Sequence, residues 1–225
     1  MQKTNTSEAE INRVFALLCG KSGAGKTYAL GTLPNEETLI LALDPGLLTL
    51  KGKKIDVWKI ESVDDLGAAY RELKEGTKYK HICIDSLTEL SEMCFAALKP
   101  NFTRKENFAL YDEFSTRMTA LIKAFRDLTQ YNVFVTTLLK DTDDGPVIDV
   151  AQKSLGNRLS AYFDFSFLVK AFEKEGVTTR ALVSDNSVMD FLKSRSSRID
   201  EYEAVNLTNI LAKVFGESNN EEKRS

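Results

Sequence analysis

The chain has 225 residues, of which 43% are hydrophobic and 28% charged, a balance typical of a soluble globular protein with one sizeable core. Its formal net charge of −3 excludes an overall positive field that would hold duplex DNA, so any nucleic-acid site must be a local patch. No stretch approaches the roughly 18 apolar residues of a membrane span, and residues 1–10 lack the apolar centre of a secretion signal. We therefore expect a cytoplasmic protein without a membrane partner.

The first half of the chain alternates short apolar runs with turn and helix signals. A helix is expected to follow Gly25, and another to begin at Ser62, a typical N-cap residue, and to end at Gly76. Between the turn signals, four apolar runs predict strands at 13–19, 37–44, 55–60 and 80–86.

The second half continues this alternation. A fifth buried strand is expected at 132–139, then a turn-rich segment at 140–146, and two late strands at 162–172 and 177–184 joined by a turn at Glu175 and Gly176. Between residues 106 and 130, apolar residues at helical spacing predict a helix that packs on a sheet: Phe114, Met118, Leu121, Ile122, Phe125 and Leu128.

Strands that alternate with helices, several without polar alternation, predict an α/β fold. We expect a mostly parallel central sheet flanked by helices, with antiparallel edge strands. A single domain should span residues 11–215. The ends at 1–10 and 216–225 are polar, and we expect both to be disordered.

Cysteine and histidine offer little for a metal centre or a nucleophilic triad. The three cysteines have no CxxC spacing, and Cys19 and Cys83 lie inside apolar runs. The single histidine, His81, stands at the edge of a predicted strand. We interpret all of these as structural residues.

Residues 20–27, GKSGAGKT, fit the pattern G-x-x-x-x-G-K-[ST] and stand between a predicted strand and a predicted helix, as a P-loop requires. Glycines let backbone N–H groups surround phosphate oxygens, and the helix adds its positive N-terminal end. Lys26 would reach the β- and γ-phosphates of ATP, and the Thr27 hydroxyl would bind Mg²⁺. The expected nucleotide-binding residues are Gly20, Lys21, Ser22, Gly23, Ala24, Gly25, Lys26, Thr27 and Tyr28.

Two aspartates follow predicted strands and should face the same crevice. Asp85 is interpreted as a Mg²⁺ ligand, although it could instead cap the next helix, a role that Ser86 fits equally well. Asp44 is a candidate to orient the attacking water. The alternative is that Asp44 only forms a turn with the Pro-Gly that follows it.

With these motifs in order, the chain resembles a phage-encoded family of small RecA-like P-loop ATPases that is related to bacterial recombinases and includes single-strand annealing proteins. The resemblance covers residues 13 to about 215. It implies a RecA-like fold, Mg²⁺-dependent ATP hydrolysis, a homo-oligomer, and action on single-stranded DNA in the host cytoplasm, with a single-strand DNA-binding protein as a candidate partner. It rests on GKSGAGKT, ICIDSLTEL, VFVTTLLKDTDDGP, LGNRLSAYFDFSFLV and LKSRSSRIDEYEAVNLTNILAKVFG.

The resemblance also implies roles for further residues. Thr136 or Thr137 would replace a polar sensor of the γ-phosphate. Lys193 or Arg195 would reach the nucleotide of a neighbouring subunit, although a solvated basic loop at 193–198 is an equal alternative.

One departure from the family concerns Gly46, which stands where an acid is expected after the strand aspartate. Unless Asp44 takes over, ATP would be bound and turned over slowly. The expected catalytic residues are Lys26, Asp44, Asp85 and Thr136.

Two segments are eligible to contact single-stranded DNA. The segment at 99–108 interleaves Phe102 and Phe108 with Arg104 and Lys105, which suits base stacking and phosphate neutralisation. The loop at 140–145 is acidic and less suitable. For the first segment, a plain connection between helices is the alternative.

A small-molecule kinase is the main competing function, because kinases can combine a P-loop with a parallel sheet. A kinase needs arginines in a lid near the γ-phosphate, and the candidate lid at 140–146 contains none. A nucleotide-gated assembly protein is a third candidate. ATPase rates with and without single-stranded DNA would separate these functions.

Overall fold

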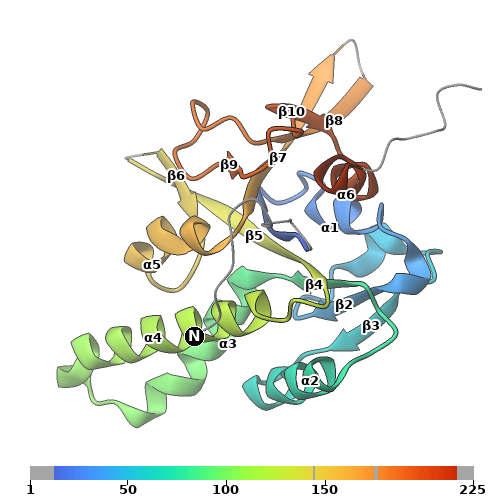
Figure 1. Cartoon of the computed structure of the whole chain (residues 1–225). Coiled ribbons are helices and arrows are strands. Elements are labelled where there is room, and N and C mark those ends of the chain that lie inside the picture. Colours follow the sequence, from blue (N-terminus) through green and yellow to red (C-terminus); the bar gives the residue numbers. More distant parts are fainter. Residues whose placement is uncertain (1–12, 144, 175–176, 217–225) are drawn as a thin grey trace, which may run out of the picture.

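The structure is a computed structural model that describes residues 13–143, 145–174 and 177–216 (Figure 1). In this part of the chain one sheet has the order β10-β8-β7-β1-β5-β4-β2-β3, with β6 paired to β5 and β9 to β7. The strands are β1 (Phe15–Gly20), β2 (Thr38–Ala42), β3 (Asp56–Lys59), β4 (His81–Asp85), β5 (Asn132–Thr142), β6 (Gly145–Ile148), β7 (Phe165–Lys174), β8 (Val177–Val183), β9 (Lys193–Ser194) and β10 (Tyr202–Ala204).

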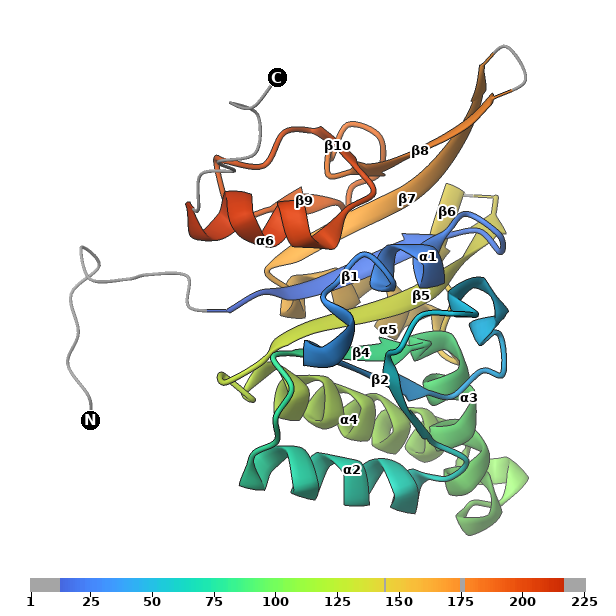
Figure 2. The same ribbon diagram turned by 90° about the vertical axis from the view of Figure 1, so that its right-hand side faces the viewer.

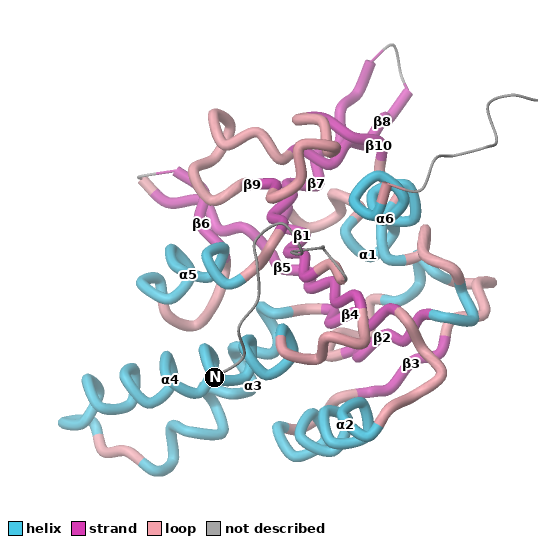
Figure 3. The backbone as a smooth tube through the Cα atoms, viewed as in Figure 1, coloured by secondary structure: helices cyan, strands magenta, loops and turns pink. Residues whose placement is uncertain are grey.

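Helices cover both faces of this sheet, as Figures 2 and 3 show. Four of them, α2 to α5, contribute to the apolar core on one face, and α1 and α6 contribute to the core on the other. The fold is therefore the predicted α/β arrangement. The helices are α1 (Lys26–Leu30), α2 (Val63–Glu75), α3 (Leu87–Leu98), α4 (Asn107–Arg126), α5 (Lys153–Leu159) and α6 (Leu207–Phe215).

The central strand β1 is buried on both faces. Phe15 and Leu17 enter the core beneath α2 to α5, and Ala16 and Leu18 enter the core beneath α1 and α6. Both neighbours, β5 and β7, pair with β1 in parallel. A parallel strand covered on both faces needs apolar residues at consecutive positions, which explains the uninterrupted run that predicted it.

The opposite edges of the sheet differ. Strands β1, β2, β3, β4, β5 and β7 pair in parallel, whereas β8 and β10 add the predicted antiparallel edge. The strand expected at 55–60 is β3, but it is a largely exposed edge strand rather than a buried one.

Other boundaries also depart from the sequence predictions. Residues 140–146 are largely strand rather than loop, because β5 continues to Thr142 and pairs antiparallel with β6. The predicted helix at 106–130 ends at Arg126, although Leu128 beyond it is still buried. The turn at Glu175 and Gly176 and the polar end at 1–10 lie outside the described residues, as does the polar end at 216–225 except for Gly216, which caps α6.

No helix in the described part of the chain combines the length and the apolar character needed to cross a bilayer. The N-cap of α2 is Ser62, as predicted, and its side chain accepts a hydrogen bond from Asp65 N.

Cys19 and His81 are structural, as the sequence predicts. Burial within β1 raises the pKa of the Cys19 thiol to about 12, so the side chain stays a neutral core group. His81 is buried at the start of β4, where its Nδ1 lies 3.2 Å from Asn132 Nδ2. Burial lowers the pKa of His81 to about 4.

The low pKa of His81 predicts that stability falls as the solution is acidified. Between pH 6.5 and 4 the unfolded chain binds a proton that the folded chain does not bind, so acidification favours unfolding. We expect the free energy of unfolding to fall by about 2 kcal/mol from pH 7 to pH 5, measured by urea denaturation.

His81→Gln should remove most of this dependence, because the chain has no second histidine. A parent protein whose unfolding free energy stays constant from pH 7 to pH 5 would contradict the prediction.

Candidate functional site

A glycine-rich turn connects the buried strand β1 to helix α1 at the carboxyl edge of the sheet. Gly23 and Gly25 have φ values of 75° and 106°, in the left-handed region that favours glycine. A Cβ on Gly20 would lie 2.8 Å from the carbonyl oxygen of Val169 in β7. The turn therefore needs glycine at these positions, and it leaves backbone groups free to surround a phosphate, as a P-loop does.

Lys26 is a buried cation at the start of α1. Its Nζ donates hydrogen bonds to the carbonyl oxygens of Gly20 (2.9 Å) and Lys21 (3.0 Å), so the side chain folds back over the turn. Burial lowers the pKa of Lys26 below its ordinary value, and the negative charge of Asp85 partly offsets this. An anion in the turn would supply the further negative charge that this desolvated ammonium favours.

Asp85 is the buried acceptor at the centre of the site. Its Oδ2 accepts a hydrogen bond from Thr27 Oγ1 at 2.9 Å, and its Oδ1 accepts one from Thr136 Oγ1 in β5. The N-cap of α3 is Ser86, whose Oγ accepts from Glu89 N at 3.4 Å. The capping role that the sequence left open therefore belongs to Ser86.

The oxygen groups of Thr27 and Asp85 fit a hard divalent cation such as Mg²⁺, which prefers hydroxyl, carboxylate and phosphate oxygens. Of the two candidate sensors, Thr136 contacts Asp85, whereas Thr137 Oγ1 lies 3.2 Å from Thr88 Oγ1. The strand β5 brings Thr136 to this place because it runs between β1 and β4.

A cavity of about 370 Å³ opens beside the turn, and it is lined by most of the residues predicted for the nucleotide and Mg²⁺, though not by Gly20, Lys21, Ala24 or Thr136. Asp44 also forms the turn that the sequence offered as an alternative, because its Oδ1 accepts from Gly46 N at 2.9 Å. Both interpretations of Asp44 are therefore compatible with its position. Among the predicted residues that line the cavity are Ser22, Lys26, Thr27, Tyr28, Asp44 and Asp85.

Two charged residues that the sequence analysis missed also line this cavity. Glu89 is the third residue of α3, and its place at the start of the helix that follows the Asp85 strand was a usable signal. Arg180 comes from β8, and its Cζ lies 5.9 Å from the ring centroid of Tyr28. Nothing local in the sequence identifies Arg180, because the order of the strands brings it there.

The basic segment at 193–198 does not line the cavity. Arg195 forms an ion pair with Asp164 at 2.7 Å, and Lys193 pairs with Ser166 in the ladder between β9 and β7. The assignment of Lys193 or Arg195 to a neighbouring subunit's nucleotide stays a prediction.

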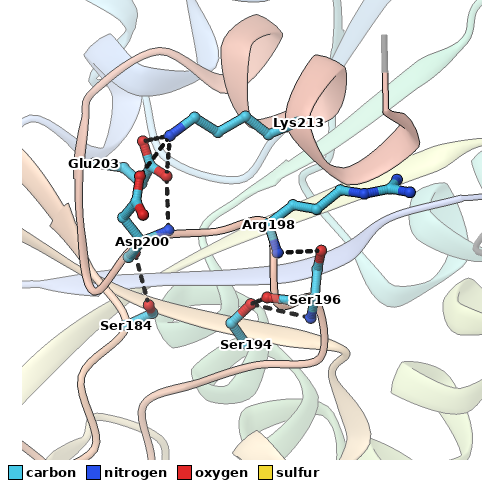
Figure 4. A network of polar contacts seen from close by, with 7 residues as sticks. All are labelled: Ser184, Ser194, Ser196, Arg198, Asp200, Glu203 and Lys213. Atoms are coloured by element: carbon cyan, nitrogen blue, oxygen red, sulfur yellow. Dashed lines mark hydrogen bonds and ion pairs between the residues drawn. The ribbon is translucent and has the colours of Figure 1, made fainter. Parts of the chain in front are cut away.

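Local hydrogen bonds hold the rest of this segment, as Figure 4 shows. Ser196 N donates to Ser194 Oγ at 3.2 Å, and Arg198 N donates to Ser196 Oγ at the same distance. The guanidinium of Arg198 donates to the carbonyl oxygen of Val214 at the end of α6. These contacts anchor the segment to the fold, while Arg195 and Arg198 remain exposed to solvent.

The segment at 99–108 forms two short 3₁₀ turns, Lys99–Asn101 and Arg104–Glu106, that lead into α4. Its two phenylalanines differ, because Phe102 packs against the core whereas 88% of Phe108 is exposed. Arg104 and Lys105 are exposed, and no acidic side chain of the described chain pairs with them.

The comparisons with known proteins agree with this site. Residues 12–196 match the family model described as "AAA domain", so the match covers more than half of the chain, including the glycine-rich turn and Asp85. A search of curated proteins found no match. AAA-type P-loop ATPases generally use ATP and Mg²⁺, which fits the buried Lys26 and the oxygen groups of Thr27 and Asp85. The chain is therefore a P-loop ATPase that belongs to the AAA domain family.

Proposed function

We propose that this protein is a RecA-like, Mg²⁺-dependent ATPase that binds single-stranded DNA in phage recombination or annealing and works as a homo-oligomer. A single-strand DNA-binding protein is its candidate partner. The observation that carries the DNA part is the exposed Phe108, which follows Arg104 and Lys105, two cations with no acidic partner among the described residues.

The nucleotide part rests on the turn at 20–25 and the residues around it. Backbone N–H groups and Lys26 would hold the β- and γ-phosphates. Thr27 and Asp85 would hold Mg²⁺, which supplies positive charge near the phosphate oxygens when it is bound. Thr136 keeps Asp85 in place through its hydrogen bond.

The DNA surface that we propose lies at the start of α4. Phe108 and Tyr111 border a cavity of about 440 Å³ together with Arg158 from α5. An exposed ring can stack on any base, and a guanidinium can neutralise phosphate or stack on a base. Arg104 and Lys105, just before Phe108, add two more positive charges, so the overall negative charge of the chain does not oppose a local site.

The helix α3 connects the two proposed sites. It begins directly after Asp85 and Ser86 at the nucleotide cavity and ends at Leu98, shortly before Arg104. Twelve residues of α-helix span about 18 Å and form a stiff connection. This arrangement supports a function in which DNA and nucleotide influence each other, and we expect single-stranded DNA to stimulate ATP turnover.

Lys26→Ala should abolish tight ATP binding, because backbone amides alone cannot offset the charge of the phosphates. We expect an affinity loss of at least about 100-fold in isothermal titration calorimetry. Lys59→Ala, which removes an exposed cation on β3, is the matched control and should leave the affinity within twofold. An unchanged affinity of Lys26→Ala would refute the P-loop assignment.

Asp85→Asn should preserve much of the nucleotide affinity but suppress turnover. The phosphate-binding turn remains intact, whereas the metal site loses its charged oxygen ligand, so we expect the ATPase rate to fall by about 100-fold or more. The rate is measured by phosphate release at saturating ATP and Mg²⁺. The exposed Asp64→Asn on α2 serves as the control, and full turnover by Asp85→Asn would move the metal role elsewhere.

Phe108→Ala should weaken binding of single-stranded oligonucleotides by about 1–3 kcal/mol, with little dependence on sequence, because every base has a stacking face. Fluorescence anisotropy with an ATP analogue present measures this affinity. Phe172→Ala on β7 removes another exposed phenylalanine and should have no effect.

The binding measurement on Phe102→Ala needs a thermal-denaturation measurement as a control, because Phe102 also packs on the core. The cations should behave differently. Replacing Arg104 or Lys105 should reduce the slope of log affinity for DNA against log salt concentration by about 0.7 for each lost phosphate contact. Parental binding by all of these variants would identify the segment as a structural connection.

A further inference from the structure

Glu89 has the position of a helix-capping acid but does not act as one. It is the third residue of α3, after the N-cap Ser86, and an acid there commonly accepts a hydrogen bond from the backbone N–H of the N-cap residue. Ser86 Oγ does accept from Glu89 N at 3.4 Å, so the cap itself is formed. Among the described residues, however, no hydrogen bond or ion pair involves the Glu89 carboxylate.

Two other acids at equivalent positions show the usual behaviour. Glu106 accepts a hydrogen bond from Thr103 N at 2.8 Å, and Asp65 accepts one from Glu61 N at 3.1 Å. Both carboxylates therefore turn back to the backbone before their helical segments. The Glu89 side chain is instead exposed at the nucleotide cavity, which Lys26 and Asp85 also line.

The other carboxylates of this cavity already have partners. Asp85 accepts hydrogen bonds from Thr27 and Thr136, and Asp44 Oδ1 accepts from Gly46 N. Gly46 stands where the resemblance implies an acid, and glycine has no carboxylate. Glu89 is thus the carboxylate of this cavity that no group of the described protein engages.

We propose that Glu89 is the general base of ATP hydrolysis, an assignment that rests on the proposed ATPase function. The Glu89 carboxylate accepts a proton from a water molecule while the water oxygen forms a bond to the γ-phosphorus. The bond between the γ-phosphorus and the bridging oxygen breaks, and ADP leaves with that electron pair. The proton then passes from Glu89 to solvent, which regenerates the carboxylate.

The test is Glu89→Gln, which keeps the size of the side chain but removes its basicity. We expect the ATPase rate at saturating ATP to fall by about 100-fold or more, the range of a lost general base. The affinity for ATP, measured by calorimetry, should stay within twofold, and thermal denaturation should show an unchanged fold. Glu92→Gln, an exposed acid three residues further along α3 and outside the cavity, should hydrolyse ATP like the parent.

A second variant separates proton transfer from a structural effect. Glu89→Ala leaves space for a small carboxylate, so added formate should restore part of its turnover and should not stimulate the parent or Glu92→Ala. Full activity of Glu89→Gln, or an inactive Glu89→Ala that formate does not rescue, overturns the assignment. Loss of turnover in Asp44→Asn with normal turnover in Glu89→Gln gives the role to Asp44.

A failure of the proposed DNA function and a failure of the Glu89 assignment give different results. A parent that binds ATP and single-stranded DNA but never hydrolyses ATP overturns the role of Glu89 and leaves the DNA site standing. A parent that hydrolyses ATP without binding single-stranded DNA overturns the DNA function and leaves the Glu89 test valid.

Discussion

The hydrogen bonds received by Asp85 join two strands, β4 and β5, and the helix α1 into one site. Thr27 follows the turn at the end of β1, Asp85 ends β4, and Thr136 lies on β5 between these two strands. Because β5 lies between β1 and β4, the Asp85 carboxylate and the Thr27 hydroxyl meet beside Thr136, in the middle of β5. The phosphate-binding turn and the metal-binding carboxylate are thus held together by the order of the sheet, and the cavity depends on that order.

The two faces of the sheet carry separate apolar cores and different helices. On one face, α3 runs from the cavity toward the segment at 99–108, and α4 begins at the end of that segment, where Phe108 is exposed. On the other face, α1 and α6 contribute to a separate apolar core, and polar contacts of Arg198 and Lys213 link α6 to the segment at 198–203. The segment at 99–108 thus packs on one face of the sheet, whereas α1, which carries Lys26 and Thr27 of the nucleotide site, packs on the other.

Local patterns in the sequence predicted what local chemistry determines. The turn at 20–27, the strand that ends at Asp85 and the cap at Ser62 follow from neighbouring residues, and the structure contains all three. Predictions failed where distant segments decide the outcome. The exposure of β3 follows from its place at the edge, and the pairing of β5 with β6 follows from a hairpin whose polar residues look like a loop.

The same limit applies to the site. The sequence predicted Lys26, Thr27 and Asp85 through motif spacing, whereas Arg180 reaches the cavity only because β8 lies two strands from β1. Phe102 and Phe108 look alike in the sequence, and only the packing of α4 separates a core residue from an exposed one. Whether Lys193 or Arg195 acts between subunits depends on an assembly that a single chain does not contain.

Arg180 also restricts how the turn can vary. Gly25 has a left-handed φ of 106°, and a Cβ at this position would in addition lie 2.7 Å from Arg180 Cδ. The two obstacles are independent, because one belongs to the backbone and the other to a side chain of β8. Shortening Arg180 removes the clash but leaves the unfavourable backbone conformation, so a paired substitution does not make alanine acceptable at position 25. Position 25 is therefore closed to compensated variation.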